Sequence, residues 1–395
     1  NGETLYVMVA TQRRMDWLKR NETSDRMWAP LLKEYRRLHP NVRVSFYTVR
    51  EEDLEEELRQ RIGRGLGPDL ILTRAPMANT LLHGGLIAPV PQTPGMVRSL
   101  AEIRPEDLRR VRNGTELAGV PVSDVVTLAC YDRKTLTTPP RTTEELMATA
   151  AAGHIIGLSL DAFGIWWTAG TQGAVDDLVP ILLGEGASTP GNEARAQKTI
   201  AAWLAWLRQL AVLSRVDLAS GPEELSQGLQ SGRVDWIPCY SLTLGTLREA
   251  MGERLGVTAL PTGPDGRPPS PFNSLDVWAF GLDSSARQRQ RAMELVKLSV
   301  DPFLQRRIVL ESQEVLSVNR LVPTPVASSG VLAALAEAQK QSEEDATSFR
   351  KPFELRHLNL VVPQMEAVIQ QVMVGVLTPE EGARQIRSFA GSRNP

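Results

Sequence analysis

The segment VRVSFYT (residues 42–48) opens the stretch that decides the fold, and EDLEEELRQRIGRG (52–65) and DLILT (69–73) follow it. The first and third segments are rich in β-branched and apolar residues, as strands are, whereas the middle one is a charged helix. LYVMVA (5–10) and MWAPLLKEYRRLHP (27–40) place a further strand and helix before them. Strand–helix–strand repetition at this spacing predicts a parallel sheet with crossover helices, which is an α/β fold.

A second alternating section runs from GHIIGLSL (153–160) to VDWIPCY (234–240). The sections are separated by LAGVPVSDVVTLACYDRKTL (117–136) and by the breaker-rich TTPPRTTEEL (137–146). A chain of 395 residues exceeds what one hydrophobic core usually supports. The sequence therefore predicts two lobes. Ligands of such sheets bind at the carboxyl ends of the strands.

Composition argues against several partners. The chain is 42% hydrophobic and 23% charged, with a formal net charge of −2, so nucleic acid is not expected as a partner. The arginine pairs Arg36–Arg37 and Arg109–Arg110 lie beside acidic residues and are expected on the solvated surface. No run of about 18 apolar residues predicts a membrane span.

The start of the chain and its cysteines bear on the compartment. NGETLYVMVA (1–10) has no Met, basic region or apolar leader, as in a mature protein whose leader has been removed, and a trimmed chain would look the same. Cys130 and Cys239 both lie in apolar segments typical of strands. The sequence leaves open whether they form a bridge or remain two buried thiols.

Motifs for catalysis or cofactors are weak. The glycines of GRGLGPDLILT (63–73) follow a helix and precede a strand, the reverse of a phosphate loop, and predict a helix stop and turn. The four histidines are scattered, so no metal is expected, and no nucleophile motif or cofactor fingerprint appears. Paired carboxylates meet only in the fold, and Asp161, beside an aromatic loop, is the acid that stands out in the sequence.

Six segments carry a resemblance to a known family, in the same order as in the family. GLGPDLILT (65–73) with LLHGGLIAPV (81–90), and residues 117–146, resemble two signatures of the extracellular solute-binding proteins of ABC importers. The family is the sugar-binding one related to maltose-binding protein. Weaker matches complete the series: LLKEYRRLHPNVRVSF (31–46), LQSGRVDWIPCY (229–240), LGVTALPTGPDG (255–266) and VVPQMEAVIQQVMVGVLTPEEGARQI (361–386).

The resemblance implies a periplasmic-binding-protein-like fold of type II. In that fold two α/β lobes, each a mainly parallel sheet flanked by helices, are joined by crossing hinge strands and close on ligand. The implied N-terminal lobe is 1–128 plus 276–330, and the C-terminal lobe is 132–272 plus 331–395. The implied crossings lie near 129–132, 273–280 and 325–335.

The sequence departs from the family at Trp236, Tyr240, Leu242 and Ile369, so the identity of the ligand does not transfer. DAFGIWWTAG (161–170) falls where the family has an aromatic loop that touches sugar. Flat aromatic faces suit the C–H-rich face of a pyranose. We expect at least one of Phe163, Trp166 and Trp167 to line the cleft, the alternative being that both indoles pack beneath the surface.

The other expected ligand-binding residues lie at strand ends or crossings. Asp124 is expected in the loop before the hinge strand, and Trp278 has a core position as its alternative. For the polar residues the alternative is a surface turn or a hinge hydrogen bond. The full set is Gln12, Arg13, Arg74, Asp124, Asp161, Phe163, Trp166, Trp167, Tyr240, Asn273, Asp276 and Trp278.

The resemblance implies a monomeric, non-enzymatic receptor that delivers a carbohydrate or sugar-like polyol to the transmembrane subunits of an ABC permease. It implies a periplasmic or extracytoplasmic location, with or without a lipid anchor before the leader was removed. The alternative is the same receptor role for a different solute. Arg13 and Arg74 would bind an anionic solute such as a sugar phosphate or glycerol phosphodiester. An osmolyte is the other alternative solute. A carboxylate-dependent hydrolase using Asp161 or Asp124 is the remote alternative.

Overall fold

The computed structural model describes residues 2–391 except 13, 14, 16, 17, 19, 160, 186–189, 214, 215, 220, 345–351 and 353. Contacts divide the chain into two units. Unit 1 comprises Asn1–Val125, Ser274–Leu332 and Arg350–Glu354, and unit 2 comprises Val126–Asn273, Ala333–Phe349 and Leu355–Pro395.

Unit 1 is built on a five-stranded sheet with the order β2-β1-β3-β12-β6. β1 pairs in parallel with β2 and β3, whereas β12 runs antiparallel between β3 and β6. Four strands therefore end at the edge where β12 begins. The strands are β1 (Glu3–Thr11), β2 (Val42–Arg50), β3 (Leu70–Arg74), β6 (Val120–Val125) and β12 (Ser274–Phe280).

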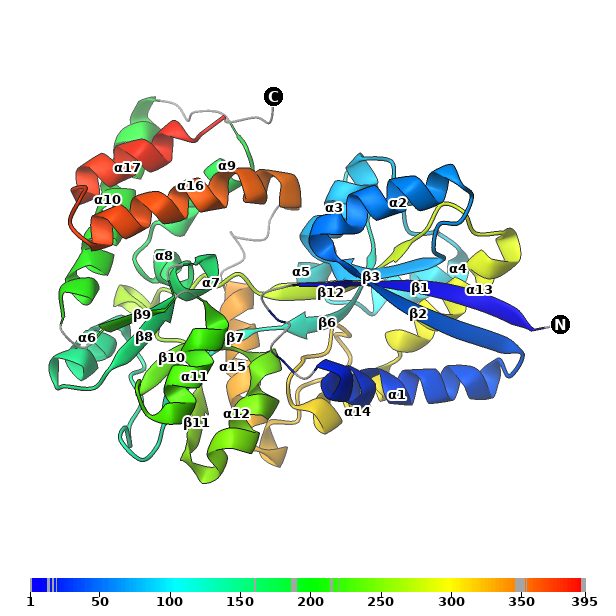
Figure 1. The fold of residues 1–395 in the computed structure, drawn as a ribbon, viewed down its shortest axis with the longest axis horizontal. Coiled ribbons are helices and arrows are strands. Elements are labelled where there is room, and N and C mark those ends of the chain that lie inside the picture. Colours follow the sequence, from blue (N-terminus) through cyan, green and yellow to red (C-terminus); the bar gives the residue numbers. More distant parts are fainter. Residues whose placement is uncertain are drawn as a thin grey trace. The chain divides into compact units, whose positions relative to one another are not determined.

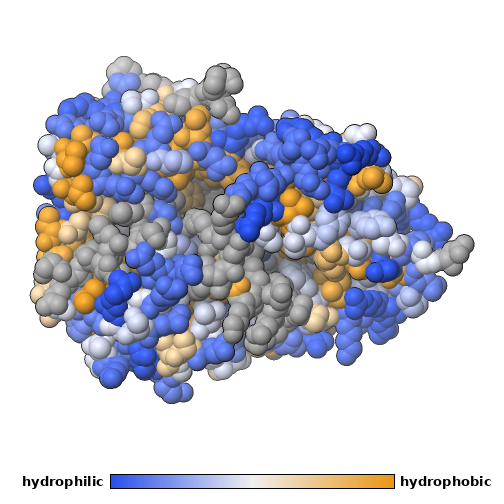
Figure 2. All heavy atoms as spheres, viewed as in Figure 1, coloured by the Kyte–Doolittle hydropathy of each residue, from blue (hydrophilic) through white to orange (hydrophobic). Residues whose placement is uncertain are grey.

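Helices cover both faces of this sheet, with α2 and α3 on one face and α1 and α14 on the other (Figure 1). The solvent side of α2 is hydrophilic (Figure 2), as its charged sequence predicts. A short hairpin, β4 (Arg112–Asn113) with β5 (Glu116–Leu117), follows α5. The helices are α1 (Arg20–Leu38), α2 (Leu54–Gly63), α3 (Ala75–His83), α4 (Pro94–Ala101), α5 (Pro105–Arg109), α13 (Ala286–Ser299) and α14 (Pro302–Ser312).

Residues 42–73 form a strand, a helix and a strand, as their sequence predicts. Gly65 has a φ of 67°, which suits glycine, and the turn there leads from α2 into β3. The buried Asp69 then accepts a hydrogen bond of 2.9 Å from the Tyr6 N–H of β1 and one of 2.6 Å from the Ser284 hydroxyl. The turn is thus tied both to the parallel neighbour of β3 and to the segment that leads into α13.

Unit 2 has a second five-stranded sheet with the order β11-β7-β10-β8-β9. β8 is parallel to β9 and β10, whereas β7 runs antiparallel between β10 and β11. Each sheet is thus mainly parallel with one reversed strand. The strands are β7 (Thr127–Asp132), β8 (Ile156–Ser159), β9 (Val216–Ala219), β10 (Trp236–Tyr240) and β11 (Leu255–Thr258).

The helices of unit 2 include a group in which α16 and α17 pack on α10 (Figure 1). Thr378 caps α17 by accepting a hydrogen bond from the Glu381 N–H, and the Glu381 side chain accepts one from the Thr378 N–H. The helices are α6 (Thr143–Ala151), α7 (Ala162–Ile165), α8 (Trp167–Thr171), α9 (Val175–Leu182), α10 (Pro190–Val212), α11 (Pro222–Ser231), α12 (Leu244–Met251), α16 (Leu355–Met373) and α17 (Pro379–Ser388).

Each unit has its own apolar core. In unit 1 the core gathers around Leu5, Leu70 and Trp278, and in unit 2 a cluster forms around Leu158, Trp167 and Trp236. None of the helices in the described parts of the chain has the length and hydropathy that a membrane crossing requires.

The passages between the units lie at 125/126, 273/274 and 332/333, the last within α15 (Gly330–Glu344). The crossing expected at 129–132 falls inside β7, where the chain has already entered unit 2. That these passages act as hinges stays a prediction.

Cys130 and Cys239 form a disulfide, which resolves the alternatives left open by the sequence. The bridge joins β7 to β10, with 5.9 Å between the Cα atoms, and both residues are buried. It closes a loop with a sequence separation of 109, so it restricts the unfolded chain strongly.

Replacing both cysteines, Cys130→Ala with Cys239→Ala, should lower the free energy of unfolding by about 2–4 kcal/mol, the usual loss for a native disulfide. Chemical denaturation of oxidised wild type, of reduced wild type and of the double variant measures this. Both forms without the bridge should unfold earlier than oxidised wild type, and three coincident transitions would contradict the prediction.

Candidate functional site

Polar side chains gather at the carboxyl edge of the unit 1 sheet, here called the unit 1 edge: Gln12, Glu51, Arg74, Ser123, Asp124 and Asp276. Asp276, near the start of β12, lies opposite Arg74 of β3 on one side and Ser123 of β6 on the other. The Ser123 hydroxyl donates a 3.2 Å hydrogen bond to the Asp276 carboxylate. Pairing of three strands therefore places these three residues side by side.

Arg74 is paired with Glu51, a residue that the sequence analysis missed. Its Nε lies 2.9 Å from Glu51 Oε2, and its Nη2 lies 2.5 Å from Oε1, a two-point ion pair. Glu51 is buried at the end of β2, and β2 is separated from β3 by β1. The positive charge of Arg74 is therefore balanced within unit 1.

Asp124 was expected in a loop, but it lies in a strand. It belongs to β6, and its N–H and C=O groups form hydrogen bonds of 3.1 and 2.9 Å with the backbone of Leu316. Its carboxylate lies 3.7 Å from Arg104 Nη1 and 4.0 Å from Arg110 Nη1. The expectation of a loop was wrong because β6 continues to Val125, beyond the point where the turn residues of the sequence indicate its end.

Arg110 is not on the solvated surface, which corrects a second expectation. Its side chain is only 12% exposed, and Asn79 donates a 2.9 Å hydrogen bond to its carbonyl oxygen. Arg36 and Arg37 are exposed as expected. The acidic neighbours of Arg110 in the sequence suggested that it lies on the surface beside them. In the structure it lies near a carboxylate of β6, that of Asp124.

Asp107 completes this buried group of charges. One of its carboxylate oxygens lies 3.9 Å from Arg104 Nη1. Burial, followed by the carboxylate of Asp124, raises the pKa of Asp107 to about 8, against the opposing effect of the guanidinium groups of Arg104 and Arg110. Burial also lowers the pKa of the Arg110 guanidinium below its usual value. Asp107 therefore keeps its proton to a higher pH than an ordinary carboxyl group, and the carboxylate of Asp124 lies within 4.0 Å of both arginines.

The remaining expected residues of unit 1 have different positions. Gln12 directly follows β1 and is partly exposed, whereas Arg13 lies outside the described residues. Trp278 takes its alternative position in the core: it is buried, contacts Trp28, and donates a 3.0 Å hydrogen bond from Nε1 to Ser299 Oγ.

Unit 2 has a corresponding group at its own carboxyl edge, the unit 2 edge: Thr127, Ser159, Asp161 and Tyr240. Asp161 accepts hydrogen bonds from the Ser159 hydroxyl and, at 3.2 Å, from the Gly164 N–H of α7. A carboxylate at the first turn of a helix stabilises the helix by this kind of bond. This contact gives Asp161 a structural role, and a role in ligand binding stays a prediction.

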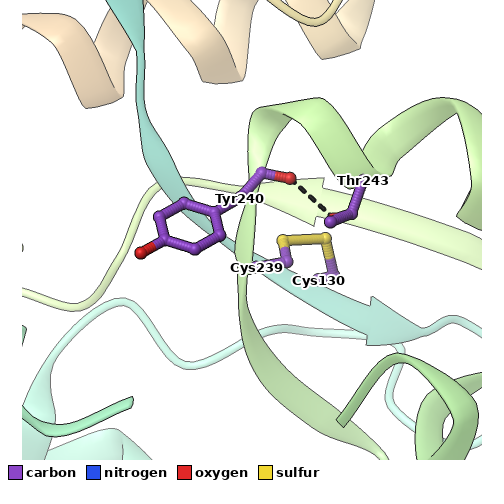
Figure 3. Close-up of a disulfide and its surroundings, with 4 residues drawn as sticks. All are labelled: Cys130, Cys239, Tyr240 and Thr243. Carbon is purple, nitrogen blue, oxygen red and sulfur yellow. Dashed lines mark hydrogen bonds between the residues drawn. A yellow bond between two sulfur atoms is a disulfide. The ribbon is translucent and has the colours of Figure 1, made fainter. Parts of the chain in front are cut away.

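Tyr240 is the last residue of β10 and lies opposite Thr127 of β7. Thr243 donates a 2.7 Å hydrogen bond to its carbonyl oxygen, and the disulfide begins at the preceding residue. Figure 3 shows the Tyr240 ring pointing away from the sulfur atoms. The disulfide and this turn therefore fix the backbone from which the ring extends.

The two tryptophans of the aromatic loop are buried, at 2% exposure for Trp166 and 0% for Trp167. Trp166 contacts the rings of Trp203 and Phe272, and Trp167 contacts that of Trp236. Both indole N–H groups lack a hydrogen-bond partner within the described part of the chain. Ring packing therefore holds them, whereas the side chain of Phe163 lies outside what the structure describes. Contact of these rings with a ligand stays a prediction.

Asn273 is buried and is the last residue of unit 2 before the passage at 273/274. Its Oδ1 accepts a 2.9 Å hydrogen bond from the Thr127 N–H, and its Nδ2 donates to Ser342 of α15. These are bonds of the kind that the sequence analysis gave as the alternative to ligand binding. Among the described residues, no group of three histidine, cysteine, aspartate or glutamate side chains is arranged to hold a metal ion.

The Asp107→Asn variant removes the ionisable group while keeping its shape. Because the pKa of Asp107 in the folded protein exceeds its unfolded value, the folded state holds the proton more tightly, and this stabilisation is lost as the pH rises towards 8. The stability of wild type relative to Asp107→Asn should therefore fall from about pH 4 to about pH 8, by at most about 1.4 kcal/mol per pH unit for one proton.

Thermal unfolding at several pH values measures this difference. Glu106→Gln, at a more exposed carboxyl group of the same helix, is the matched control and should give a profile close to that of wild type, because Glu106 makes the smallest of the contributions to the pKa of Asp107. Parallel profiles for wild type and Asp107→Asn would contradict the prediction.

No family model matches the sequence, and no curated protein matches it. Solved structures match over nearly the whole chain. One is the GacH receptor of Streptomyces glaucescens, solved without ligand and with acarbose: TM-score 0.72, 15% identity, 98% of this chain and 97% of that chain. Another is a cyclo/maltodextrin-binding protein in complex with maltotetraose: TM-score 0.72, 17% identity, 99% of this chain and 97% of that chain. The chain therefore has the two-lobe α/β fold of these binding proteins.

Proposed function

We propose that this protein is the substrate-binding component of an ABC importer, which captures a neutral carbohydrate or sugar-like polyol between its two units. The charge balance of the unit 1 edge is the observation that carries the proposal. The fold supports it, because the two similar structures are described as a receptor with acarbose and a maltodextrin-binding protein with maltotetraose. Closure of the units on the solute would remove it from water.

The charges at the unit 1 edge favour a neutral ligand. Three arginines and four carboxyl groups lie at or behind the edge: Arg74, Arg104, Arg110, Glu51, Asp107, Asp124 and Asp276. With Asp107 protonated, the charges of these seven described side chains sum to zero. An anion would have to compete with the carboxylates that already pair with these arginines, whereas a sugar hydroxyl both donates to carboxylates and accepts from arginines.

The same pairing weakens the case for a phosphorylated or other anionic solute. Arg74, one of the two arginines on which that alternative rests, is held by Glu51 at two points. The other, Arg13, lies outside the described residues. The anionic ligand is therefore kept as the second outcome of the binding experiment.

The contacts of Asp124 and Asp161 also favour a receptor over a hydrolase. A glycosidase needs two carboxyl groups on either side of the scissile bond, one of them free to give up a proton. Asp124 is an internal counter-ion of two arginines, and Asp161 caps a helix. These contacts favour a binding role without a catalytic step.

The remaining parts of the proposal are the partner, the location and the oligomeric state. The disulfide supports an extracytoplasmic location, since such bonds persist in oxidising compartments. The transmembrane subunits of a permease are the proposed partner, and a monomer is the proposed state. A lipid anchor before the first residue is compatible with this arrangement.

A thermal-shift screen of neutral oligosaccharides such as maltotetraose, polyols, sugar phosphates and glycerol phosphodiesters tests the proposal. A ligand at 100 times its Kd should add about 2.7 kcal/mol and raise the Tm by a few degrees. A response to neutral sugars or polyols is expected. A response confined to phosphorylated compounds would overturn the neutral-ligand proposal.

The double variant Arg74→Gln with Glu51→Gln sharpens the distinction, because it removes both charges together and leaves the edge neutral. Its Kd for a neutral sugar should stay within about tenfold of wild type, or about 1.4 kcal/mol. Glu55→Gln with Arg59→Gln, an exposed ion pair on α2, is the matched control. Complete loss of sugar binding in the edge variant alone would show that the charge of this pair itself holds the ligand.

A further inference from the structure

The places where the chain enters and leaves unit 2 share one buried amide side chain. Asn273 is the last residue before the chain returns to unit 1, and Thr127 is the second residue after the chain has entered unit 2. The 2.9 Å bond from the Thr127 N–H to Asn273 Oδ1 joins these two segments, which are 146 residues apart in the sequence.

The third passage is joined to the same side chain. α15 carries the passage at 332/333, and its Ser342 accepts the hydrogen bond that Asn273 Nδ2 donates. The Ser342 hydroxyl in turn donates a 3.1 Å bond to the Ala338 carbonyl one turn earlier in the helix. All three segments therefore meet at Asn273.

A neighbouring pair of bonds supports the first of these segments. The Val126 N–H donates a 3.2 Å bond to the Ser241 hydroxyl, and the Ser241 N–H donates a 2.9 Å bond to the Val126 carbonyl. Ser241 is fully buried directly after β10, two residues beyond the disulfide. Two successive N–H groups of the entering strand are thus satisfied by side chains of other segments.

We propose that Asn273 is a positioning residue that makes the three passages into unit 2 move as one rigid base. This inference rests on the proposed receptor function, in which the units change their relative position when ligand binds. Asn273 would act through the backbone of Thr127 and through α15 rather than on the ligand.

The chemistry of the amide explains why asparagine suits this position. An amide side chain supplies an acceptor and a donor at once, whereas a carboxylate only accepts. Alanine would leave the Thr127 N–H, one of the strand's own donors, without its partner in a buried place. The side-chain bonds that join the three segments at Asn273 would then be lost, and of the described hydrogen-bonded links only the pairing of β12 with β6, which begins at Ser274 and Val125, would remain between the first two segments.

The distribution of distances between the two units tests this without any ligand. Spin labels at Leu66→Cys in unit 1 and Val376→Cys in unit 2, both at exposed positions, report it by pulsed electron spin resonance, since the native cysteines are held in the disulfide. Asn273→Ala should broaden the distribution of label-to-label distances, compared with the same doubly labelled protein that keeps Asn273. An unchanged width would overturn the proposal.

Gln341→Ala is the matched control. Gln341 precedes Ser342 on the same helix, is also buried, and donates a 3.1 Å bond to the Leu260 carbonyl within unit 2. It should lower the Tm without broadening the distribution. Equal broadening in Asn273→Ala and Gln341→Ala would indicate general loosening of unit 2 and would also overturn the proposal.

Two milder variants keep the test decisive if Asn273→Ala does not fold. Asn273→Asp keeps the acceptor for the Thr127 N–H, and Ser342→Ala removes only the acceptor on α15. Each should broaden the distribution less than Asn273→Ala, and wild-type widths in both would contradict the proposal. Because no ligand is present, these outcomes are separate from success or failure of the sugar screen.

Discussion

Each of the two sheets is held together by one reversed strand, β12 in unit 1 and β7 in unit 2. β12 lies between β3 and β6, so the sheet of unit 1 is completed only by residues that follow most of unit 2 in the sequence. β7 occupies the equivalent place in unit 2, between β10 and β11. Both reversed strands begin at the edge where the parallel strands end, within two residues of a passage between the units. One arrangement of strands therefore sets both the passages and the polar edges.

Ion pairs between arginines and carboxyl groups distinguish the unit 1 edge. Three described arginines, Arg74, Arg104 and Arg110, each have their guanidinium group within 4.0 Å of a carboxyl group from a different element or turn. Buried pairs of this kind cost desolvation and are stable only when they remain paired. These described pairs thus offer donors and acceptors in fixed positions with their charges largely balanced, which suits hydroxyl groups better than phosphate. The unit 2 edge adds an aromatic ring at Tyr240 beside a rigid, disulfide-linked strand pair.

Sequence patterns predicted the strands and helices of residues 5–73 because hydrophobic period and turn residues act locally, and the resemblance carried the two-lobe fold. Neither the sequence patterns nor the resemblance predicted which charged residues pair with each other. Arg110 has acidic neighbours in the sequence but pairs with Asp124 of β6, and Arg74 pairs with Glu51 of another strand end. Strand order decides such pairs, and strand order is not a local property. The disulfide was undecided for the same reason, since only the register of β7 and β10 brings Cys130 and Cys239 together.

Amide hydrogen exchange with and without a bound sugar tests the central claim most directly, namely that one ligand is held by both units. The account predicts that a single bound oligosaccharide slows exchange at the unit 1 edge, in residues 72–77 and 120–125, and at the unit 2 edge, in residues 159–167 and 238–243. Slower exchange in only one unit, or two independent binding events of which each protects one edge, would contradict capture between the units.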